Sequence, residues 1–518
     1  MAAECLEARA LLSNIAVTAQ AGVVTLVGDT GDHTLAASVV NGELELTGTN
    51  GTTLTFKGTT AATVDVPLPK TLKAIHIDLP GAGNNTVTVD GTGLPKVAGN
   101  FSVNLGGGTD SFSLSNTTVK GTVSVNAGNG ADTISLSNDK TGEVSIRVGN
   151  GADTIQLAGD TTKEVEIKAG NGIDTTSLTN DATGSVSIRT GNGGDTITAS
   201  NDTSGNVAIR TGSGADSIQL TSDTTGRVAV TSGAGNDSIM LSNVTMQAKV
   251  QLGNDDADEG HGDGKSHGDD HGNGHGDDKG DDKGDDHGDD LVDQGDEGEH
   301  DDLRTPVALA ITTGNGNDTV ELDSVVGMGP GSGGSKWQIN LGSGKNTLTM
   351  NDDTDPGFLN VSAQGTGNDV VKISGSTFAK NVVIALPDGK DHITLTGDTF
   401  GNPVFLSTGT GSGSTIAVDD SNFNSLTKFA MAGDNATLNV ETAATAGTGT
   451  TFQGPVQASL TGASAAVNLG TNTVNDSLVF DKLLKISGGS PAALVTVGTA
   501  NTTFNGPVVL HNATRVNT

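Results

Sequence analysis

The stretch GNGADTISLSNDKTGEVSIRV, residues 128–148, contains one complete unit of the repeat that decides the fold. Its first half returns as GNGADTIQL, GNGIDTTSL, GNGGDTITA, GSGADSIQL and GAGNDSIML, and the motif aspartates are Asp132, Asp153, Asp174, Asp195, Asp216 and Asp237. Successive aspartates are 21 residues apart, and Asp110 precedes the series by 22. A strict period of this length indicates a repeat architecture.

Apolar and polar residues alternate within each unit, which is the period of a β-strand and not of a helix. One apolar column contains Ile134, Ile155, Ile197, Ile218 and Ile239, and a second contains Val144, Val165, Val186, Val207 and Val228. Coils of one period stack each column over itself, and Gly and Asn at fixed offsets supply the positive-φ corners. We therefore predict an all-β fold, a parallel β-helix (β-solenoid) with coils of about 21–23 residues.

The repeat divides the chain into segments. Residues 101–253 are predicted to form the regular coils, and residues 16–100, with their Gly, Asn and Thr-rich turns, irregular first coils. Residues 1–15 are an export-type segment or a short cap, with a possible helix over residues 4–12. Residues 305–518 are predicted to form looser coils with a stack of phenylalanines, namely Phe378, Phe400, Phe423, Phe452, Phe480 and Phe504. We expect no amphipathic cap after these coils.

One segment breaks the pattern. Residues 254–302 contain 21 acids, 3 lysines and 6 of the 10 histidines, so their net charge is 18 negatives in 49 residues. A segment of this composition cannot bury a core, and we predict a disordered Asp, Gly and His-rich insert over residues 254–304. The strand pattern resumes at VALAITTGNGND, so the solenoid is expected to continue across the insert. The histidines and aspartates predict loose binding of divalent metals, without the fixed spacing of a preformed site.

Composition excludes several classes of protein. The chain has 76 glycines, no tyrosine and one tryptophan, so it cannot assemble one large globular core. A formal net charge of −34 argues against binding nucleic acid or anionic lipid, and no apolar run approaches the roughly 20 residues that span a bilayer. The single cysteine, Cys5, excludes an intramolecular disulfide.

The row of corner aspartates poses an electrostatic problem, because stacked coils lie only about 4.8 Å apart. Either each carboxylate accepts hydrogen bonds from N–H groups of its own turn, or divalent cations lie between successive carboxylates. GNGADTISL resembles the nonapeptide repeats of RTX-type secreted proteins, which follow GGxGxDxUx and hold calcium between turns. The resemblance implies calcium at Asp132, Asp153, Asp174, Asp195, Asp216, Asp237 and Asp318. RTX repeats recur every nine residues, whereas GNGxD recurs here every 21.

Three further rows follow the same period. Asp139, Asp160, Asp181, Asp202 and Asp223 form a second acidic row, and Asn138, Asn180 and Asn201 are expected to form a structural ladder of amides. Arg147, Lys168, Arg189 and Arg210 form a cationic stripe. The stripe either pairs with Glu143, Glu164 and Glu166 or docks an acidic polysaccharide.

Catalysis is not expected. Polysaccharide lyases and hydrolases with this fold need carboxylates, basic residues and aromatic platforms in a cleft, whereas Trp337 is isolated in this sequence. His33, His76, His392 and His511 have no evident Ser, Cys or carboxylate partner in the repeat. We predict no catalytic residues and no organic cofactor.

The N-terminal LEARALLS resembles the LEPR-XLL element of exported planctomycete proteins. Leu6, Glu7, Arg9, Leu11 and Leu12 match, and Ala8 replaces the proline. This resemblance implies a cell-surface or extracellular location. Since a solenoid has two open ends, we expect head-to-tail self-association into a cation-stabilised surface fibre or layer. The first alternative is a non-polymerising adhesin or calcium-binding module for extracellular acidic polysaccharide. The second and less favoured alternative is a polysaccharide lyase.

Overall fold

The computed structural model describes residues 13–247, 307–328, 336–355, 357–443, 447–471, 476–498 and 501–517. Over these ranges the chain forms β-strands and turns and no helix. Residues 1–252 and 305–518 belong to one compact unit. The acidic insert, the LEARALLS element and the helix expected over residues 4–12 lie outside the described residues.

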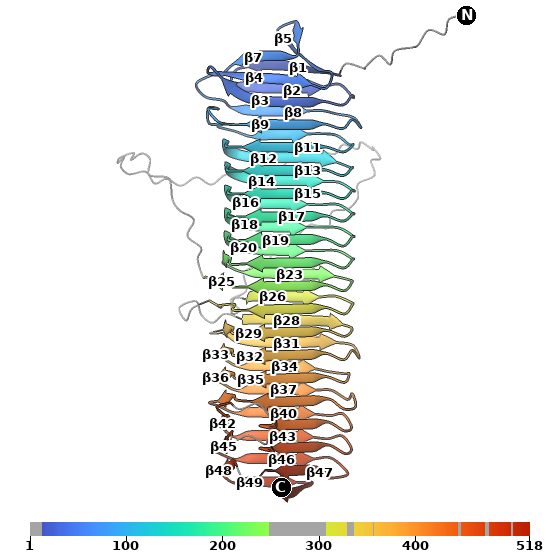
Figure 1. The fold of residues 1–518 in the computed structure, drawn as a ribbon, viewed down its shortest axis with the longest axis vertical. Coiled ribbons are helices and arrows are strands. Elements are labelled where there is room, and N and C mark those ends of the chain that lie inside the picture. The colour runs from blue at the N-terminus through green and yellow to red at the C-terminus, as the bar shows by residue number, and fades with distance from the viewer. Residues whose placement is uncertain are drawn as a thin grey trace, which may run out of the picture. The chain divides into compact units, whose positions relative to one another are not determined.

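The predicted parallel β-solenoid is confirmed. The strands stack into long parallel sheets, and a shorter 7-stranded sheet lines the corner of the later coils (Figure 1). A regular coil consists of β13 (Thr133–Ser137) and β14 (Lys140–Val148). The next coil is β15 (Thr154–Ala158) and β16 (Thr161–Lys168), and the two coils pair in parallel at a register of 21 residues. The coils that follow are β17 (Thr175–Thr179) with β18 (Ala182–Arg189), β19 (Thr196–Ser200) with β20 (Thr203–Arg210), and β21 (Ser217–Thr221) with β22 (Thr224–Thr225) and β23 (Val228–Gly233).

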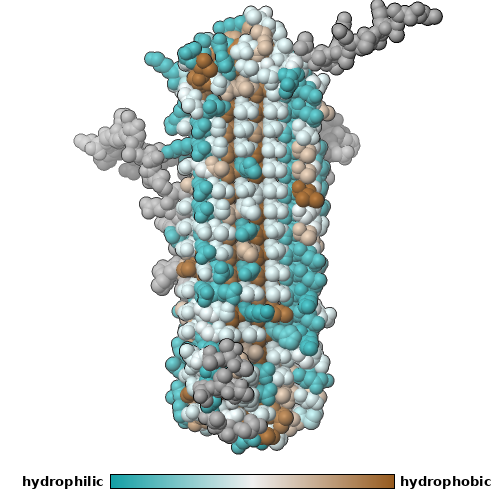
Figure 2. All heavy atoms as spheres, viewed as in Figure 1, coloured by the Kyte–Doolittle hydropathy of each residue, from teal (hydrophilic) through white to brown (hydrophobic). Residues whose placement is uncertain are grey.

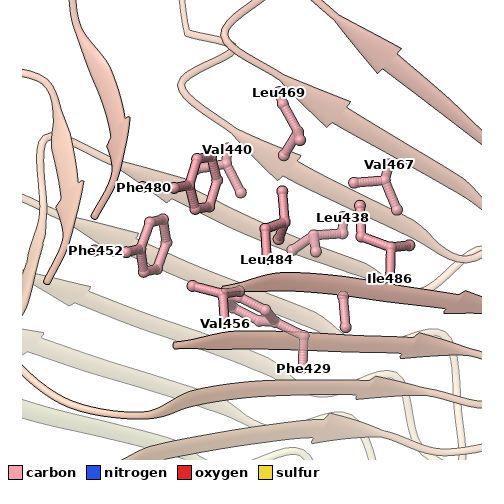
Figure 3. Close-up of a pocket in the computed structure, with 11 residues that line it drawn as sticks. Phe429, Leu438, Val440, Phe452, Val456, Val467, Leu469, Phe480, Leu484 and Ile486 are labelled. Carbon is pink, nitrogen blue, oxygen red and sulfur yellow. The ribbon is translucent and has the colours of Figure 1, made fainter. Parts of the chain in front are cut away.

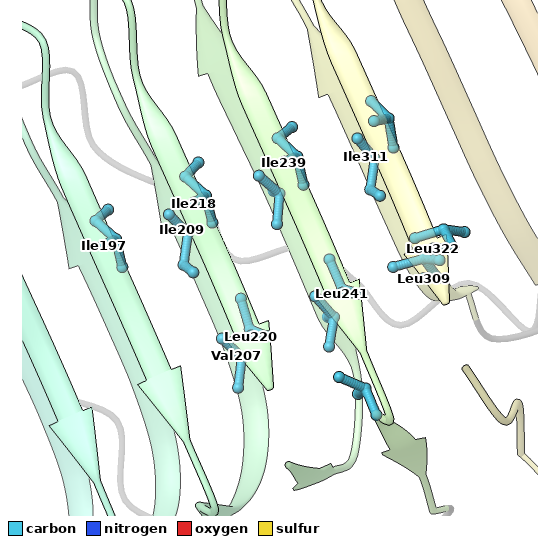
Figure 4. Close-up of a cluster of buried hydrophobic side chains, with 14 of the residues drawn as sticks. Ile197, Val207, Ile209, Ile218, Leu220, Ile239, Leu241, Leu309, Ile311 and Leu322 are labelled. Carbon is cyan, nitrogen blue, oxygen red and sulfur yellow. The ribbon is translucent and has the colours of Figure 1, made fainter. Parts of the chain in front are cut away.

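The core is a narrow column between the sheets. Ile134 stacks on Ile155, and Val144 stacks on Val165, all at most 1 % exposed. Figure 4 shows the same columns further along, where Ile197, Ile218 and Ile239 face residues of the opposite sheet. Side chains alternate inward and outward, and Figure 2 shows the result as rows of hydrophobic and polar residues along one face of the solenoid. Both predicted apolar columns are therefore confirmed.

The solenoid continues across the acidic insert, as predicted. β26 (Val307–Thr313) pairs in parallel with β23, and β27 (Thr319–Asp323) pairs with β24 (Ser238–Ser242). The phenylalanine stack is also confirmed, with ring centroids of neighbouring coils 4.7–5.6 Å apart from Phe378 to Phe504.

The first coils differ from the prediction because they are built from antiparallel hairpins. β1 (Ser13–Gln20) pairs with β2 (Val23–Gly28), β3 (Thr34–Val40) with β4 (Glu43–Thr49), β4 with β7 (Thr63–Pro67), and β5 (Thr52–Phe56) with β6 (Thr59–Ala61). Parallel pairing is present between β1 and β5 and continues where β8 (Ala74–Asp78) and β9 (Thr86–Asp90) pair with β2 and β3. Asn41–Gly42 and Asn50–Gly51 have positive φ at both residues, as the tight turns of hairpins require.

The last described coil ends in an exposed strand that carries polar groups. β50 (Ala513–Asn517) places Arg515 and Asn517 in register with the buried Val495 and Val497 of β47 (Ala493–Val497). The Arg515 guanidinium lies 5.5 Å from the ring centroid of Phe504, and its Nε donates a 2.7 Å hydrogen bond to Asn517 Oδ1. Arg515 therefore partly covers the end of the apolar column.

One buried threonine interrupts the isoleucine column and gives a stability prediction. Thr176 lies between Ile155 and Ile197, is 0 % exposed, and its hydroxyl has no hydrogen-bond partner. Since an unsatisfied buried hydroxyl costs about 1–3 kcal/mol, the near-isosteric Thr176→Val is expected to raise the thermal unfolding midpoint. The control is Thr175→Val at the neighbouring exposed position, where a change within about 0.5 kcal/mol is expected. Equal midpoints for the two variants would contradict this account.

Candidate functional site

The GNGxD aspartates lie inside the solenoid and not on its surface. Asp132, Asp153, Asp174, Asp195, Asp216, Asp237 and Asp318 are each 1–3 % exposed. The Oδ1 atom of each accepts a hydrogen bond from the backbone N–H of the aspartate one coil earlier, at 2.8–3.0 Å. The donor thus belongs to the preceding coil. A donor in the aspartate's own turn was one of the two alternatives expected from the sequence. The row therefore joins successive coils.

The second acidic row is arranged in the same way. Asp139, Asp160, Asp181, Asp202 and Asp223 are 2–5 % exposed. Their Oδ1 atoms accept the N–H groups of Thr117 and of the preceding row members at 2.7–2.8 Å. At both corners of the regular coils, hydrogen bonds from backbone N–H groups to aspartate side chains therefore connect successive coils. They add to the backbone hydrogen bonds between the strands.

The second oxygen of these carboxyls is left unused, with one exception. Among the described residues, the Oδ2 atom is buried without a hydrogen-bond partner in every member of the two rows except Asp181, whose Oδ2 accepts the Thr179 N–H at 3.1 Å. Burial, which disfavours the charged form, raises the pKa of Asp132, Asp153 and Asp174 to about 6. In the second row, burial and neighbouring aspartates together raise the pKa of Asp160 and Asp202 to about 7. Binding a proton therefore offers a third way to relieve the repulsion, besides hydrogen bonding and cations.

Calcium at the seven GNGxD aspartates stays a prediction. Calcium prefers six to eight oxygen ligands, and each of these carboxyls has one oxygen engaged by an N–H group and one orphaned oxygen. The orphaned oxygens suit a cation chemically. A calcium ion would still need further ligands from the corner backbone or from water.

The charge of a single row member can be tested with a neutral isostere. Asn346 already occupies this position in the chain, where its Oδ1 accepts the Asp318 N–H at 3.0 Å. We expect Asp174→Asn to raise the unfolding midpoint at about pH 8, because the acceptor is kept and a buried charge is lost. Asp174→Ala should lower the free energy of unfolding by about 1–3 kcal/mol, because the Asp153 N–H loses its acceptor.

Circular dichroism during thermal unfolding, with and without a chelator, measures both variants. A destabilised Asp174→Asn, together with a wild type that loses stability in chelator, would contradict the proton-based account and support calcium.

The outward-facing asparagines also form hydrogen bonds between coils. The amide ladder between coils runs through the GNG asparagines Asn129, Asn150, Asn171 and Asn192, at 2.9–3.1 Å. Asn138, Asn180 and Asn201, where that ladder had been expected, hold the left-handed corner at φ 56–58°.

In the cationic stripe, Lys168 pairs with Glu166 at 2.6 Å. The carboxyl of Glu166 has a lowered pKa, mainly because of its hydrogen bond with Lys168 and with further contributions from Arg147 and Arg189.

Two histidines have partners that the repeat frame does not reveal. The Nε2 atom of buried His33 lies 3.2 Å from Asp29 Oδ1, and its Nδ1 lies 2.9 Å from Asn85 Oδ1. His76 Nδ1 lies 2.5 Å from Ser102 Oγ on the adjacent strand β10 (Phe101–Asn104). The expectation of unpartnered histidines was therefore wrong for both, because hairpin turns and a coil of different length bring these residues together. Trp337 is fully buried.

Sequence reasoning missed a cluster of carboxyls in the later coils. Asp420, Glu441 and Asp476 come from three successive coils, and Asp419 lies beside them. The separation of Asp420 and Glu441 in the chain equals the 21-residue period, but Asp476 follows Glu441 by 35 residues and so departs from the repeat. An unusual concentration of acids directly after two strands, VDD and NVE, was the available signal.

Within the described ranges, the chain contains no helix that is long and apolar enough to cross a membrane. Comparison with protein-family models, curated proteins and solved structures finds no match to this chain.

Proposed function

We propose that this chain is an extracellular structural protein that forms a surface fibre or layer by end-to-end association of its solenoids. The observation that carries the proposal is the pair of strand edges at the two ends of the stack (Figure 1). Among the described strands, β6 and β7 at the first coil pair on one side only, as do β49 (Val508–His511) and β50 at the last. Unpaired edges can template strands of another copy.

Strand direction favours a head-to-tail arrangement. β7 is antiparallel to β4, and β4 is antiparallel to β3, so β7 runs in the same direction as β3. The strand β3 is parallel to β9 and, through the stacked sheet, to β50. A second copy can therefore add β7 to β50 with the parallel pairing used throughout the solenoid.

Charge favours the same arrangement. β4 and β7 carry Glu43, Glu45 and Asp65 at the N-terminal end, whereas residues 482–518 contain two lysines, one arginine and no acid in a chain of net charge −34. Opposite charges at the two ends attract in the head-to-tail orientation and repel in the others. Arg515 lies on the edge strand β50, where an acidic strand of the next copy would meet it.

The cavities inside the solenoid support a structural role over a catalytic one. The cavity of the later coils measures about 10 Å³ and is lined by apolar side chains such as Phe452, Phe480 and Leu484 (Figure 3). Another, of about 20 Å³, lies beside Ala199, which replaces leucine in an apolar column. Spaces of this size hold about one water molecule. The proposal therefore assigns no substrate and no reaction.

Negative-stain electron microscopy of the full chain, at low and high salt, tests the proposal. We expect rods joined end to end at low salt and single rods at high salt, because salt screens the charged ends. Reversing Glu43 and Asp65 to lysine should abolish joining, whereas reversing Arg189 and Arg210 on the lateral stripe should not. Single rods under all conditions, or joining that survives the end reversals, would overturn it.

A second function, adhesion to acidic polysaccharide, is favoured by the register of the cationic stripe. Arg147, Lys168, Arg189 and Arg210 align on neighbouring strands. Their spacing of about 4.8 Å per coil presents a linear array of charge. Glycan-array binding that is lost in an Arg189→Glu, Arg210→Glu variant would support adhesion. Unchanged binding would exclude the cationic stripe as the binding surface.

A further inference from the structure

The carboxyl cluster of the later coils lies at one corner, where three consecutive coils meet. Asp420 follows β38 (Thr415–Asp419), and Glu441 follows β41 (Thr437–Val440) on the adjacent parallel strand. Asp476 belongs to the next coil and precedes β45 (Leu478–Phe480). Asp420 and Glu441 both have left-handed backbone, at φ 51° and 52°. Asn138, Asn180 and Asn201 adopt the same left-handed conformation at the corners of the regular coils, so this conformation is part of the corner geometry.

The carboxyl groups converge on a single point. One carboxylate oxygen from each of Asp420, Glu441 and Asp476 lies within 4.8 Å of the others. Gly449 N–H donates to Asp420 Oδ1 at 2.8 Å, and Gly447 N–H donates to Asp476 Oδ1 at 2.9 Å. Glu441 Oε1 accepts the Asp420 N–H at 2.8 Å and the Thr450 hydroxyl at 2.5 Å. Each carboxylate is thus oriented by hydrogen bonds to one of its oxygens.

The surrounding chain leaves room for this convergence. A Cβ atom at Gly447 would lie 1.9 Å from both carboxylate oxygens of Asp420. Only glycine at this position allows the Asp420 carboxylate to occupy its place. The close approach of backbone to carboxylate is a feature of a built site and not of a solvated acidic surface.

A separate observation indicates that a ligand is missing from the hydrogen-bond network. Glu441 is 0 % exposed, and within the part of the chain that the structure describes its Oε2 atom is buried without a hydrogen-bond partner. Among the described residues, no lysine, arginine or histidine forms an ion pair with this cluster. A buried carboxylate surrounded by other acids requires a positive partner.

We infer that Asp420, Glu441 and Asp476 bind one divalent cation of the calcium type. All the donors are hard oxygen atoms, which exclude a preference for soft metals. The irregular corner suits calcium, which tolerates flexible geometry, better than magnesium, which demands a near-ideal octahedron. The ion joins three successive coils in a region where the coil length departs from 21 residues. This site is distinct from the GNGxD row and does not depend on the proposed fibre.

Isothermal titration of the chelator-stripped full chain with calcium chloride tests the inference at neutral pH. We expect one tight site per chain above the weak binding of the other acids, and a rise in the unfolding midpoint on calcium addition. Glu441→Gln and Asp476→Asn should each weaken the tight site at least about tenfold, since affinity follows ligand charge. The matched control is Asp434→Asn, an exposed acid of the same coils, and it should keep full affinity.

The Glu441→Gln variant also gives a readout without calcium. In chelator it should be more stable than the wild type, because one repelling charge is removed, and it should gain less from calcium. This opposite sign separates loss of the site from a failure to fold. A tight site that persists in both variants, a site selective for magnesium, or a wild type without any tight site would overturn the inference.

Discussion

Lowering the pH from about 8 to about 5 is expected to stabilise this protein, the reverse of ordinary acid denaturation. The reason lies in the buried aspartates, whose pKa is raised by desolvation to about 6 or 7. These are Asp110, Asp132, Asp139, Asp153, Asp160, Asp174, Asp181, Asp202, Asp223, Asp353, Asp391 and Asp398. Their unfolded value is near 3.8.

The sign follows from proton linkage. Between about pH 4 and 7 the folded chain binds more protons than the unfolded chain, so the free energy of unfolding falls as the pH rises through this range. The stabilisation is complete below about pH 4 and is lost above about pH 7. Each pKa unit corresponds to about 1.4 kcal/mol per group. Even a small part of these pKa shifts, summed over the two aspartate rows, is expected to lower the unfolding midpoint by about 10 °C or more as the pH rises through this range.

Thermal unfolding followed by circular dichroism over this pH range is the measurement. A triple variant, Asp160→Asn, Asp181→Asn and Asp202→Asn, should flatten the profile and be more stable than the wild type at about pH 8. A matched triple of exposed acids, Glu143→Gln, Glu164→Gln and Asp65→Asn, should leave the profile's shape unchanged. A midpoint that falls between about pH 8 and pH 5 would show that the rows are charged and neutralised in another way.

The repeat made the fold predictable because its register is a local consequence of its period. Once like residues recur every 21 positions, stacking Ile134 on Ile155 follows from strand geometry without knowledge of distant contacts. The hairpins of the first coils carried their own signal in two Asn-Gly turns. Because these turns lie outside the 21-residue period, the repeat predicts only irregular coils there.

The direction of the aspartate side chains was not predictable in the same way. Charged residues are seldom buried, and the repeat places Asp132 and its equivalents at a corner without indicating whether their side chains point inward. Their burial depends on the N–H groups of the preceding coil, which become available only when the coils are stacked. The cluster of Asp420, Glu441 and Asp476 depends in addition on coils of unequal length, and no fixed spacing can reveal it.

The two kinds of acidic site resolve like-charge repulsion differently. In the rows, each carboxyl meets one neighbour on each side, and one N–H group plus a proton is sufficient. In the cluster, three carboxylates converge with no N–H group left for Glu441 Oε2, so a proton on one group leaves two charges facing each other. A change of pH should therefore alter the stability through the aspartate rows, and a chelator should alter it through the carboxyl cluster. The two effects can be measured separately.

Gly172→Ala is expected to have the largest effect of any single substitution in the regular coils. Gly172 has a φ of 150°, and a Cβ atom there would lie 1.4 Å from the carbonyl oxygen of Gly151 in the preceding coil. No rotamer change relieves a contact between Cβ and backbone, so the coils must separate. Separation breaks the 2.8 Å hydrogen bond from Gly172 N–H to Asn192 O and disturbs the adjacent Asp174. We expect a loss above about 4 kcal/mol, as for other overpacked backbone sites.

Hydrogen exchange resolved along the chain is the measurement that tests this prediction, because stacked repeats can open locally. Protection should fall in the coils next to Gly172 and persist in the phenylalanine-stacked coils beyond residue 377. The control is Gly42→Ala in the first hairpins, where φ is 84° and no atom lies within 4 Å of the added Cβ. That change carries only the cost of left-handed backbone, about 1–2 kcal/mol. If the two alanine variants lost equal stability, positive φ alone would explain the corner glycines, and the close stacking of GNG corners would not be what requires them.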